Sequence, residues 1–325
     1  LSLTPSINIM IRKILLFSFS VLFFTSCLDS EINYTNQSEN QQRYNSQIFQ
    51  TITVSENVRY GANVTLGGTT TGLSMDIYQP ANDTETNRPL VILAHGGSYI
   101  SGDKKDLTEL ATFIAKAGYV VASINYRLLD VTPTQLAFKQ VVINSVADMK
   151  ASVRYFTKDA ATTNLYKTDS TKVFIGGYSA GAITALHYAY VNTDTELTTI
   201  GGQTFLDYVN SKGGIEGMSG NESHSSTVKG VINISGALFN KSFINSNEPK
   251  IFSIHGTDDI VVPYLQGNIN NTGIIGDGSG ILHPYATSIG LKNELKAIQN
   301  GKHDAFLNCN SCLVEIRSFL FSLLQ

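Results

Sequence analysis

Ser179 lies where a strand pattern passes into a helix pattern, a position suited to a reactive hydroxyl. The surrounding residues, 174–190, read FIGGYSAGAITALHYAY, so that glycine and alanine flank the serine. Small residues permit a very sharp strand-to-helix turn, which lifts the hydroxyl above the sheet and beside a helix N-terminus. The alternative is an ordinary small-residue turn in which Ser179 caps the helix. The flanking strand and helix patterns favour Ser179 as a nucleophile.

A serine hydroxyl is a poor nucleophile unless a general base takes its proton. The chain has six histidines. Five are expected to have structural or solvent-facing positions: His95, His187, His224, His255 and His283. His303 lies in the loop sequence QNGKHDAF late in the chain and is the predicted base.

The remaining parts of an acyl-transfer site are a carboxylate for the base and donors for the developing oxyanion. Asp258 and Asp259 follow a strand pattern in SIHGTDDIVVP, and one of them is expected to face the site. The backbone N–H of Ala180, which follows the nucleophile, is one expected oxyanion donor. The turn HGGS after an earlier strand supplies two more, from Gly97 and Ser98, because glycine lets the backbone approach a ligand closely.

The elements that must position these residues alternate between strand and helix from residue 90 to the end. Apolar runs predict strands at 89–97, 119–127, 172–177, 228–236 and 249–256. Helical spacing predicts helices at 105–117, 134–160, 179–191, 285–299 and 312–324. This order predicts an α/β fold with a mostly parallel central sheet and helices on both faces. The first two or three strands lack helices and are expected to pair antiparallel at one edge.

The domain organisation follows from shifts in composition. Residues 1–27 are expected to hold an upstream extension and a signal peptide, since a basic segment precedes an apolar run too short to span a membrane. Residues 28–50 are polar and predict a tether. Residues 51–325 form the predicted α/β domain. Two segments interrupt its alternation, 193–227 and 264–283, and are expected to cover the site.

Composition and the number of cysteines limit which partners and cofactors are expected. The net charge is −3 and only 15% of residues are charged, so no basic face for nucleic acid is expected. Of the three cysteines, Cys309 and Cys312 are expected to form a local disulfide, because one such pair is too few ligands for zinc. The chemistry expected of Ser179 needs no metal or organic cofactor.

The quoted segments resemble the α/β-hydrolase-fold serine carboxylesterases of the HGG type, similar to hormone-sensitive-lipase-like, feruloyl and acetyl-xylan esterases. HGGSYISGDK resembles their oxyanion loop, GYSAG their nucleophile turn, HGTDDIVVP their acid loop and GKHDAF the histidine segment. The resemblance covers roughly residues 50 to 325. It implies that Asp259 rather than Asp258 is the acid. It also implies structural roles for Asp148 and Arg154.

One position departs from that family: Ser98 stands where the HGGG form has its third glycine, and it keeps a backbone N–H. Tyr99, next to the oxyanion turn, and Tyr178, next to the nucleophile, are expected to line the substrate pocket. No large helical cap precedes His95.

The N-terminus resembles a bacterial lipoprotein signal, in which Thr25-Ser26-Cys27 ends the apolar run. The resemblance implies lipidation of Cys27 and an exported protein of the bacterial cell envelope, periplasmic or surface-facing, or otherwise secreted. Membrane contact is expected only through that anchor. Residues 1–9 precede the first Met and are expected to be a mis-assigned extension.

The predicted function is hydrolysis of carboxylic esters through an acyl-enzyme. The expected substrate is a small-molecule or glycan-linked ester with a short-chain, acetyl or feruloyl group. One alternative is a serine peptidase of the prolyl-oligopeptidase type, although the stretch before residue 51 is too short for a propeller domain. A second alternative is a non-catalytic surface lipoprotein that uses the fold for binding.

Overall fold

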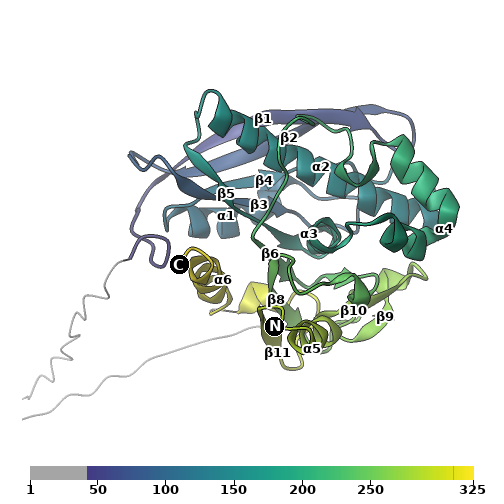
Figure 1. Ribbon diagram of the computed structural model, residues 1–325. Coiled ribbons are helices and arrows are strands. Elements are labelled where there is room, and N and C mark those ends of the chain that lie inside the picture. The colour runs from purple at the N-terminus through teal and green to yellow at the C-terminus, as the bar shows by residue number, and fades with distance from the viewer. Residues whose placement is uncertain (1–41, 310) are drawn as a thin grey trace, which may run out of the picture. The chain divides into compact units, whose positions relative to one another are not determined.

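An eight-stranded sheet forms the centre of the protein, seen in a computed structural model that describes residues 42–309 and 311–325 (Figure 1). In order across the sheet, the strands are β1 (Ile52–Val64), β2 (Thr70–Pro80), β4 (Val120–Ile124), β3 (Arg88–Ala94), β5 (Thr168–Tyr178), β6 (Gly230–Ile234), β8 (Lys250–Gly256) and β11 (Asn293–Ile298). From β4 to β11 neighbours run parallel, whereas β1 pairs antiparallel with β2 and β2 antiparallel with β4. The predicted α/β fold, with its antiparallel N-terminal edge, is confirmed.

Helices cover both faces of this sheet. They are α1 (Thr108–Ala115), α2 (Gln135–Ala161), α3 (Ala180–Tyr190), α4 (Asp194–Ser211), α5 (Ser279–Ser288) and α6 (Cys312–Ser322). Successive residues of a strand point to opposite faces, and β3 is buried along its whole length. Its Leu90 and Ile92 pack in the core with α2 and α3, while Val91 and Leu93 pack in the core with α1 and α6. Burial on both faces explains why the central strands are continuous apolar runs.

Smaller elements complete the domain. A second sheet contains β7 (Ala237–Leu238), β10 (Ile275–Gly278) and β9 (Gln266–Asn268), paired antiparallel. The 3₁₀ helices are η1 (Lys104–Leu107), η2 (Gly214–Glu216), η3 (Lys241–Phe243), η4 (Ile269–Asn271) and η5 (Ala305–Asn308). Within the described ranges, no helix is long and apolar enough to cross a membrane.

The helix predicted over 285–299 is wrong. Helix α5 ends at Ser288, and Gly290 takes a left-handed φ of 76° that stops it. The chain then returns as β11, which pairs in parallel with β8 at the sheet edge. The residues NELKAI favour a helix locally, so the free backbone edge of β8 overrides their propensity.

The segment 193–227 is more regular than its polar sequence indicates. It contains α4 and η2, and it packs against α2. Glu216 of η2 forms ion pairs with Lys150 at 2.6 Å and with Arg154 at 3.2 Å, both on α2. Arg154 therefore has a contact that holds this segment to the domain.

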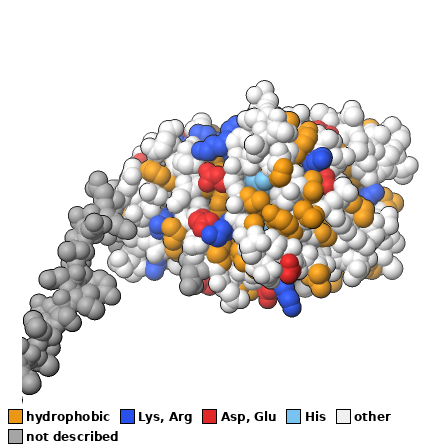
Figure 2. Space-filling view, turned by 90° about the horizontal axis from the view of Figure 1, so that it is seen from below, with side chains coloured by type: hydrophobic (Ala, Val, Ile, Leu, Met, Phe, Trp, Pro, Cys, Tyr) orange, Lys and Arg blue, Asp and Glu red, His pale blue; other side chains and the backbone are white. Residues whose placement is uncertain are grey.

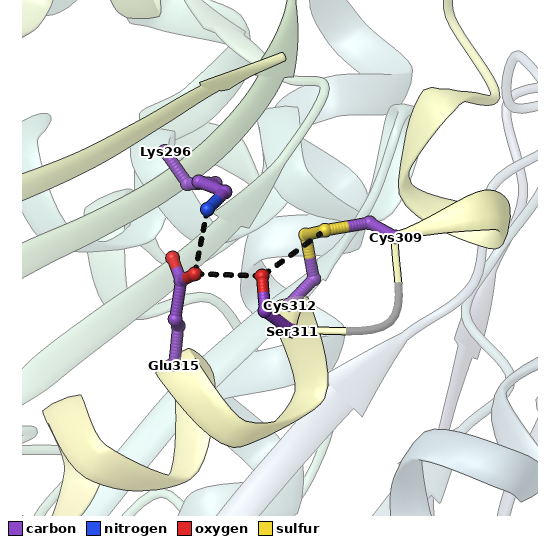
Figure 3. The surroundings of a disulfide bond; sticks show 5 residues. All are labelled: Lys296, Cys309, Ser311, Cys312 and Glu315. Carbon is purple, nitrogen blue, oxygen red and sulfur yellow. Dashed lines mark hydrogen bonds and ion pairs between the residues drawn. A yellow bond between two sulfur atoms is a disulfide. The ribbon is translucent and has the colours of Figure 1, made fainter.

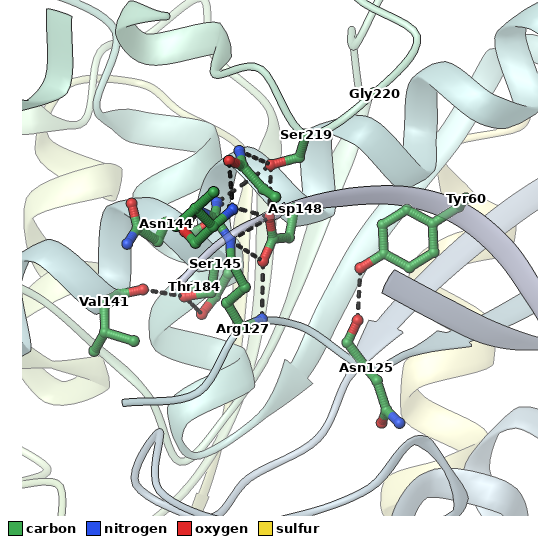
Figure 4. Close-up of polar contacts among 12 residues, drawn as sticks. Tyr60, Asn125, Arg127, Val141, Asn144, Ser145, Asp148, Thr184, Ser219 and Gly220 are labelled. Carbon is green, nitrogen blue, oxygen red and sulfur yellow. Dashed lines mark hydrogen bonds and ion pairs between the residues drawn. The ribbon is translucent and has the colours of Figure 1, made fainter. Parts of the chain in front are cut away.

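A buried ion pair connects several of these elements (Figure 4). Arg127, in the loop after β4, contacts Asp148 of α2 with Nη2 to Oδ1 at 2.8 Å. The guanidinium also donates to the backbone carbonyls of Val64 and Asn144, and Ser219 Oγ donates to Asp148 at 2.6 Å. Because these buried charges are paired and share several hydrogen bonds, they join β1, α2 and two loops into one rigid unit.

Cys309 and Cys312 form a disulfide between η5 and the start of α6 (Figure 3). Next to it, Glu315 accepts from Ser311 Oγ at 2.8 Å and pairs with Lys296 of β11 at 2.7 Å. The start of α6 is thus linked both to η5 and to the last strand.

Cys27 and the predicted signal peptide lie outside the described residues, as does most of the predicted tether. The tether's last residues, 42–50, contact the domain. The N–H of Tyr44 donates to the carbonyl of Ala117 at 2.8 Å, and Arg43 pairs with Asp83 at 2.5 Å.

Candidate active site

Ser179 lies in a strained turn between β5 and α3. Its φ is 54°, in the left-handed region that costs a non-glycine residue energy. A Cβ added at Gly177 would lie 2.4 Å from the carbonyl oxygen of Ala94, and one at Gly181 would lie 2.0 Å from it. Only glycine fits at these two positions, because the turn is pressed directly against the end of β3.

His303 contacts both Ser179 and Asp259. Its Nε2 lies 2.8 Å from Ser179 Oγ, and its Nδ1 lies 2.7 Å from Asp259 Oδ2. The three residues follow β5, β8 and β11, whose carboxyl ends meet at one edge of the sheet because these strands are parallel. The structure therefore brings the expected nucleophile, base and acid into one hydrogen-bonded chain.

Asp259 is buried, and its carboxylate accepts three hydrogen bonds. Oδ1 accepts from the backbone N–H groups of Val261 and Val262 at 2.8 and 2.9 Å. Oδ2 lies near both His303 and His255, whose Nε2 is 3.2 Å away. Burial alone would raise the pKa of this carboxyl, but the two neighbouring imidazoles and the backbone N–H groups outweigh burial and hold the pKa well below its usual range. Asp259 is therefore ionised at neutral pH.

Asp258 differs from its neighbour. Its side chain is exposed, and its Oδ1 accepts from Thr257 Oγ1 at 3.4 Å, the one side-chain partner it has among the described residues. Of the two adjacent aspartates, Asp259 alone reaches His303 in this structure.

The main chain of His303 is fixed separately from its ring. Its carbonyl accepts from Ser235 Oγ at 3.0 Å and from the Tyr178 hydroxyl at 3.3 Å. The Tyr178 ring lies 5.3 Å from the imidazole, and burial raises the pKa of this phenol to about 12. Tyr178 is therefore a neutral donor that holds the histidine loop, and it is not among the residues that line the pocket at Ser179.

The turn HGGS lies directly against Ser179. A Cβ added at Gly96 would be 3.3 Å from the Cβ of Ser179, and Gly97 and Ser98 have φ values of 106° and 55°. Ala180 is the first residue of α3, so its N–H has no acceptor within the helix. Of the three expected oxyanion donors, Ser98 and Ala180 line the pocket at Ser179, and Gly97 is not among its lining residues.

Two tyrosines pack against the turn HGGS and the start of α3 and hold them by hydrogen bonds. The hydroxyl of Tyr126, in the loop that carries Arg127, donates to the carbonyl of His95 at 2.8 Å, and the two rings stack at 4.5 Å. Tyr99 is fully buried, and its hydroxyl donates to the carbonyl of Ala180 at 2.7 Å. The buried ion pair of Figure 4 thus supports the loop on which this turn rests.

A small pocket opens beside Ser179, with a cavity volume of about 10 Å³, which is room for about one water molecule. Its lining is Ser98, Tyr99, Phe138, Ser179, Ala180, Ile183, Val261, Val262, Ile269 and Asn270. Tyr99 lines this pocket as expected. Segment 264–283 contributes two residues to it, whereas 193–227 contributes none. The expectation that both segments cover the site is therefore wrong for 193–227, which packs on α2.

Sequence reasoning missed two residues of this site. His255 was expected to be structural, and it is buried against Asp259, with Nδ1 2.9 Å from Ser279 Oγ. Asn270 contacts Ser98 across the pocket, and nothing in the polar stretch around it distinguishes it from its neighbours. His283, expected in solvent, is buried. Helix α5, which carries it, packs against β8 and β11, and the Nδ1 of His283 lies 2.8 Å from Asn293 Oδ1.

No metal-binding arrangement is present in the part of the chain that the structure describes. There, no three histidine, cysteine, aspartate or glutamate side chains are grouped so as to hold an ion.

Comparison with known proteins also indicates an esterase. A family model described as BD-FAE matches residues 75–238, just over half of the chain. The chain belongs to the BD-FAE family. BD-FAE proteins are α/β-hydrolase esterases, so this chain is a carboxylic ester hydrolase. The matched range contains the oxyanion turn and Ser179, whereas Asp259 and His303 lie beyond it.

Solved structures resemble this BD-FAE chain in fold. A truncated carbohydrate esterase from gut microbiota has a TM-score of 0.60 at 20% identity, over 85% of this chain and 97% of that one. The apo form of Thermogutta terrifontis esterase 2 has a TM-score of 0.59 at 18% identity, over 82% and 94%. Its propionate-bound form has a TM-score of 0.59 at 19% identity, over the same shares. Among curated proteins, no significant match was found.

Proposed function

We propose that Ser179, His303 and Asp259 hydrolyse carboxylic esters through an acyl-enzyme. The observation that carries this proposal is the continuous chain of short contacts, 2.8 Å from Ser179 to His303 and 2.7 Å from His303 to Asp259. With Asp259 ionised, Nδ1 of His303 holds a proton and donates it to the carboxylate. Nε2 is then free to accept the proton of Ser179.

In the first half of the reaction, Ser179 Oγ attacks the ester carbonyl while His303 Nε2 takes its proton. The carbonyl oxygen becomes an oxyanion that accepts from the N–H groups of Gly97, Ser98 and Ala180. The intermediate collapses as the bond to the leaving alkoxide breaks, and His303 gives that alkoxide the proton. Water then attacks the acyl-enzyme by the same steps and releases the acid and free Ser179.

The dimensions of the pocket favour a small acyl group. Its inner wall is apolar and buried, formed by Tyr99, Phe138, Ile183 and Ile269, and the cavity has room for about one water molecule. An acetyl group demands the least room of the expected acyl groups, whereas a feruloyl ring requires the loops to move apart. The fold neighbour described as a carbohydrate esterase, and the one with bound propionate, support a short acyl group on a glycan.

The surface is consistent with an uncharged substrate. Figure 2 shows one face of the molecule, on which hydrophobic side chains gather in the middle and charged side chains are scattered singly or in small groups. That face carries no broad basic area of the kind that binds nucleic acid. We therefore propose a neutral ester, small or glycan-linked, as the substrate.

The test is a panel of acyl-chain lengths on one leaving group. The full chain is assayed on p-nitrophenyl acetate, butyrate and octanoate and on methyl ferulate. We expect kcat/KM to fall at least about tenfold from acetate to octanoate, since a hydrocarbon chain that finds no pocket stays in water. Equal rates on acetate, octanoate and methyl ferulate would contradict the small acyl pocket.

We further propose that the chain is exported and anchored by lipid at Cys27. The support is the sequence pattern, in which a basic segment, an apolar run and Thr25-Ser26 precede that cysteine. The test follows the full-length protein and Cys27→Ser in bacterial membrane and soluble fractions. We expect the parent in the membrane fraction and the variant outside it. The same distribution for both would contradict the anchor.

A further inference from the structure

The pocket beside Ser179 has two contrasting sides. Seven of its lining residues are buried, among them Tyr99, Ile183 and Ile269, and most of these are apolar. Ser98 and Val261 are half-buried and Asn270 is exposed, so the side that faces solvent holds two polar residues beside Val261. With the acyl group in the apolar interior, the alcohol part of an ester lies toward this solvent-facing side, the rim.

Ser98 and Asn270 contact each other across the rim. Nδ2 of Asn270 donates to Oγ of Ser98 at 3.0 Å, although the residues are 172 positions apart in the chain. Both have left-handed backbones, with φ of 55° for Ser98 and 43° for Asn270. The N–H of Asn270 also donates to the carbonyl of Val261 at 2.6 Å, which fixes the asparagine beside the acid loop. The pair is thus held by the fold rather than by chance proximity of two surface side chains.

The contact leaves several polar groups of the pair available. Oγ of Ser98 accepts from Asn270, so its own proton remains free to be donated, and Asn270 keeps one N–H and the amide oxygen. Within the described residues, no side-chain hydrogen bond to another protein group uses these. A rim with two donors and an acceptor matches neighbouring hydroxyl groups, each of which is both donor and acceptor.

We infer that Ser98 and Asn270 form a subsite for the hydroxyl groups of a polyhydroxylated alcohol, such as a sugar, that carries the ester. This inference rests on the proposed function and names the leaving-group side of the same site. Ser98 takes the place of a glycine that the HGGG form would have there, so the hydroxyl is an addition to the oxyanion turn. Its backbone N–H stays in the oxyanion site while its side chain faces the alcohol.

The test compares two acetates that share the acyl group and differ in the alcohol. One is a mono-O-acetylated methyl xyloside, whose ester has hydroxyl neighbours, and the other is phenyl acetate, which has none. The quantity measured is the ratio of kcat/KM for the xyloside to kcat/KM for phenyl acetate. In Asn270→Gly we expect this ratio to fall about fivefold, the size of one neutral hydrogen bond. Glycine adopts the same positive φ without strain, so the loop keeps its shape.

The matched control is Asn271→Gly, the same change at the next residue, which is also exposed and has a φ of 56°. We expect its ratio to equal that of the parent protein. A ratio unchanged in Asn270→Gly, or lowered equally in both variants, overturns the subsite. Failure of the parent protein to hydrolyse either acetate instead overturns the proposed function, and the subsite with it.

Discussion

Replacing Asp259 with asparagine changes the charge of the acid but leaves its shape. In the parent protein, Oδ1 accepts from the N–H groups of Val261 and Val262, and Oδ2 accepts from His303 and lies near His255. In the variant, one of these two positions must hold an NH₂ group. Two backbone donors converge on the first position, so placing NH₂ there would leave both unpaired at a cost of about 1–3 kcal/mol each. The amide oxygen therefore takes that position and the NH₂ group faces His303.

This orientation forces the wrong tautomer on His303. Its Nδ1 must accept from the NH₂ group, so the ring proton moves to Nε2, the atom that has to accept the proton of Ser179. The same change in a serine protease triad lowers kcat about 10⁴-fold, which corresponds to about 5.4 kcal/mol of barrier. We expect a loss of that order for Asp259→Asn, with KM changed little because Asp259 does not line the pocket.

The assay is steady-state hydrolysis of p-nitrophenyl acetate, with urea denaturation to show that the variant is folded. Asp258→Asn is the matched control, because it makes the same change at an adjacent, exposed carboxylate. It should retain kcat within about twofold. A folded Asp259→Asn that loses less than tenfold in kcat, or an Asp258→Asn that loses as much, would refute this account of the acid.

Two further predictions concern stability. Asp148→Asn leaves the Arg127 guanidinium buried without its counter-charge, so we expect the free energy of unfolding in urea to fall by about 3–5 kcal/mol; a change below about 1 kcal/mol would show that the network is not a stabilising unit. Burial lowers the pKa of His187 and of His283 to about 4 from 6.5. Below pH 6.5 the unfolded chain binds protons that the folded chain does not take up until about pH 4, so stability should decline across that window. Urea titrations at pH 7.5, 6 and 5 measure this, and equal unfolding free energies at all three would contradict it.

The fold and the meeting of Ser179, Asp259 and His303 could be anticipated because their signals are local. The apolar runs of the central strands are continuous, since both faces of the sheet are covered, and helix patterns separate them. Parallel strands bring their carboxyl ends to one edge, so residues far apart in sequence come together there. β11 was the exception, because its residues form a strand only when the edge of β8 is available to pair with.

The rest of the site depends on contacts that no local pattern records. Asn270 reaches Ser98 only because the loop before β10 folds back over the oxyanion turn. His255 lies four residues before Asp259 at the end of β8, and its role becomes visible only when the turn brings its ring beside that carboxylate. Both belong to a class of residue whose partners are set by loop conformation, which hydrophobic periodicity does not determine.

The central claim is that Ser179 is the nucleophile, and covalent trapping tests it most directly. The full chain is incubated with paraoxon, an organophosphate that reacts with activated serines, and its peptides are mapped by mass spectrometry while residual esterase activity is followed. We predict one diethylphosphoryl group on the peptide containing Ser179, loss of activity in proportion to that label, and no label on that peptide in Ser179→Ala. Loss of activity with the label on another residue, or full activity of Ser179→Ala, would contradict the claim.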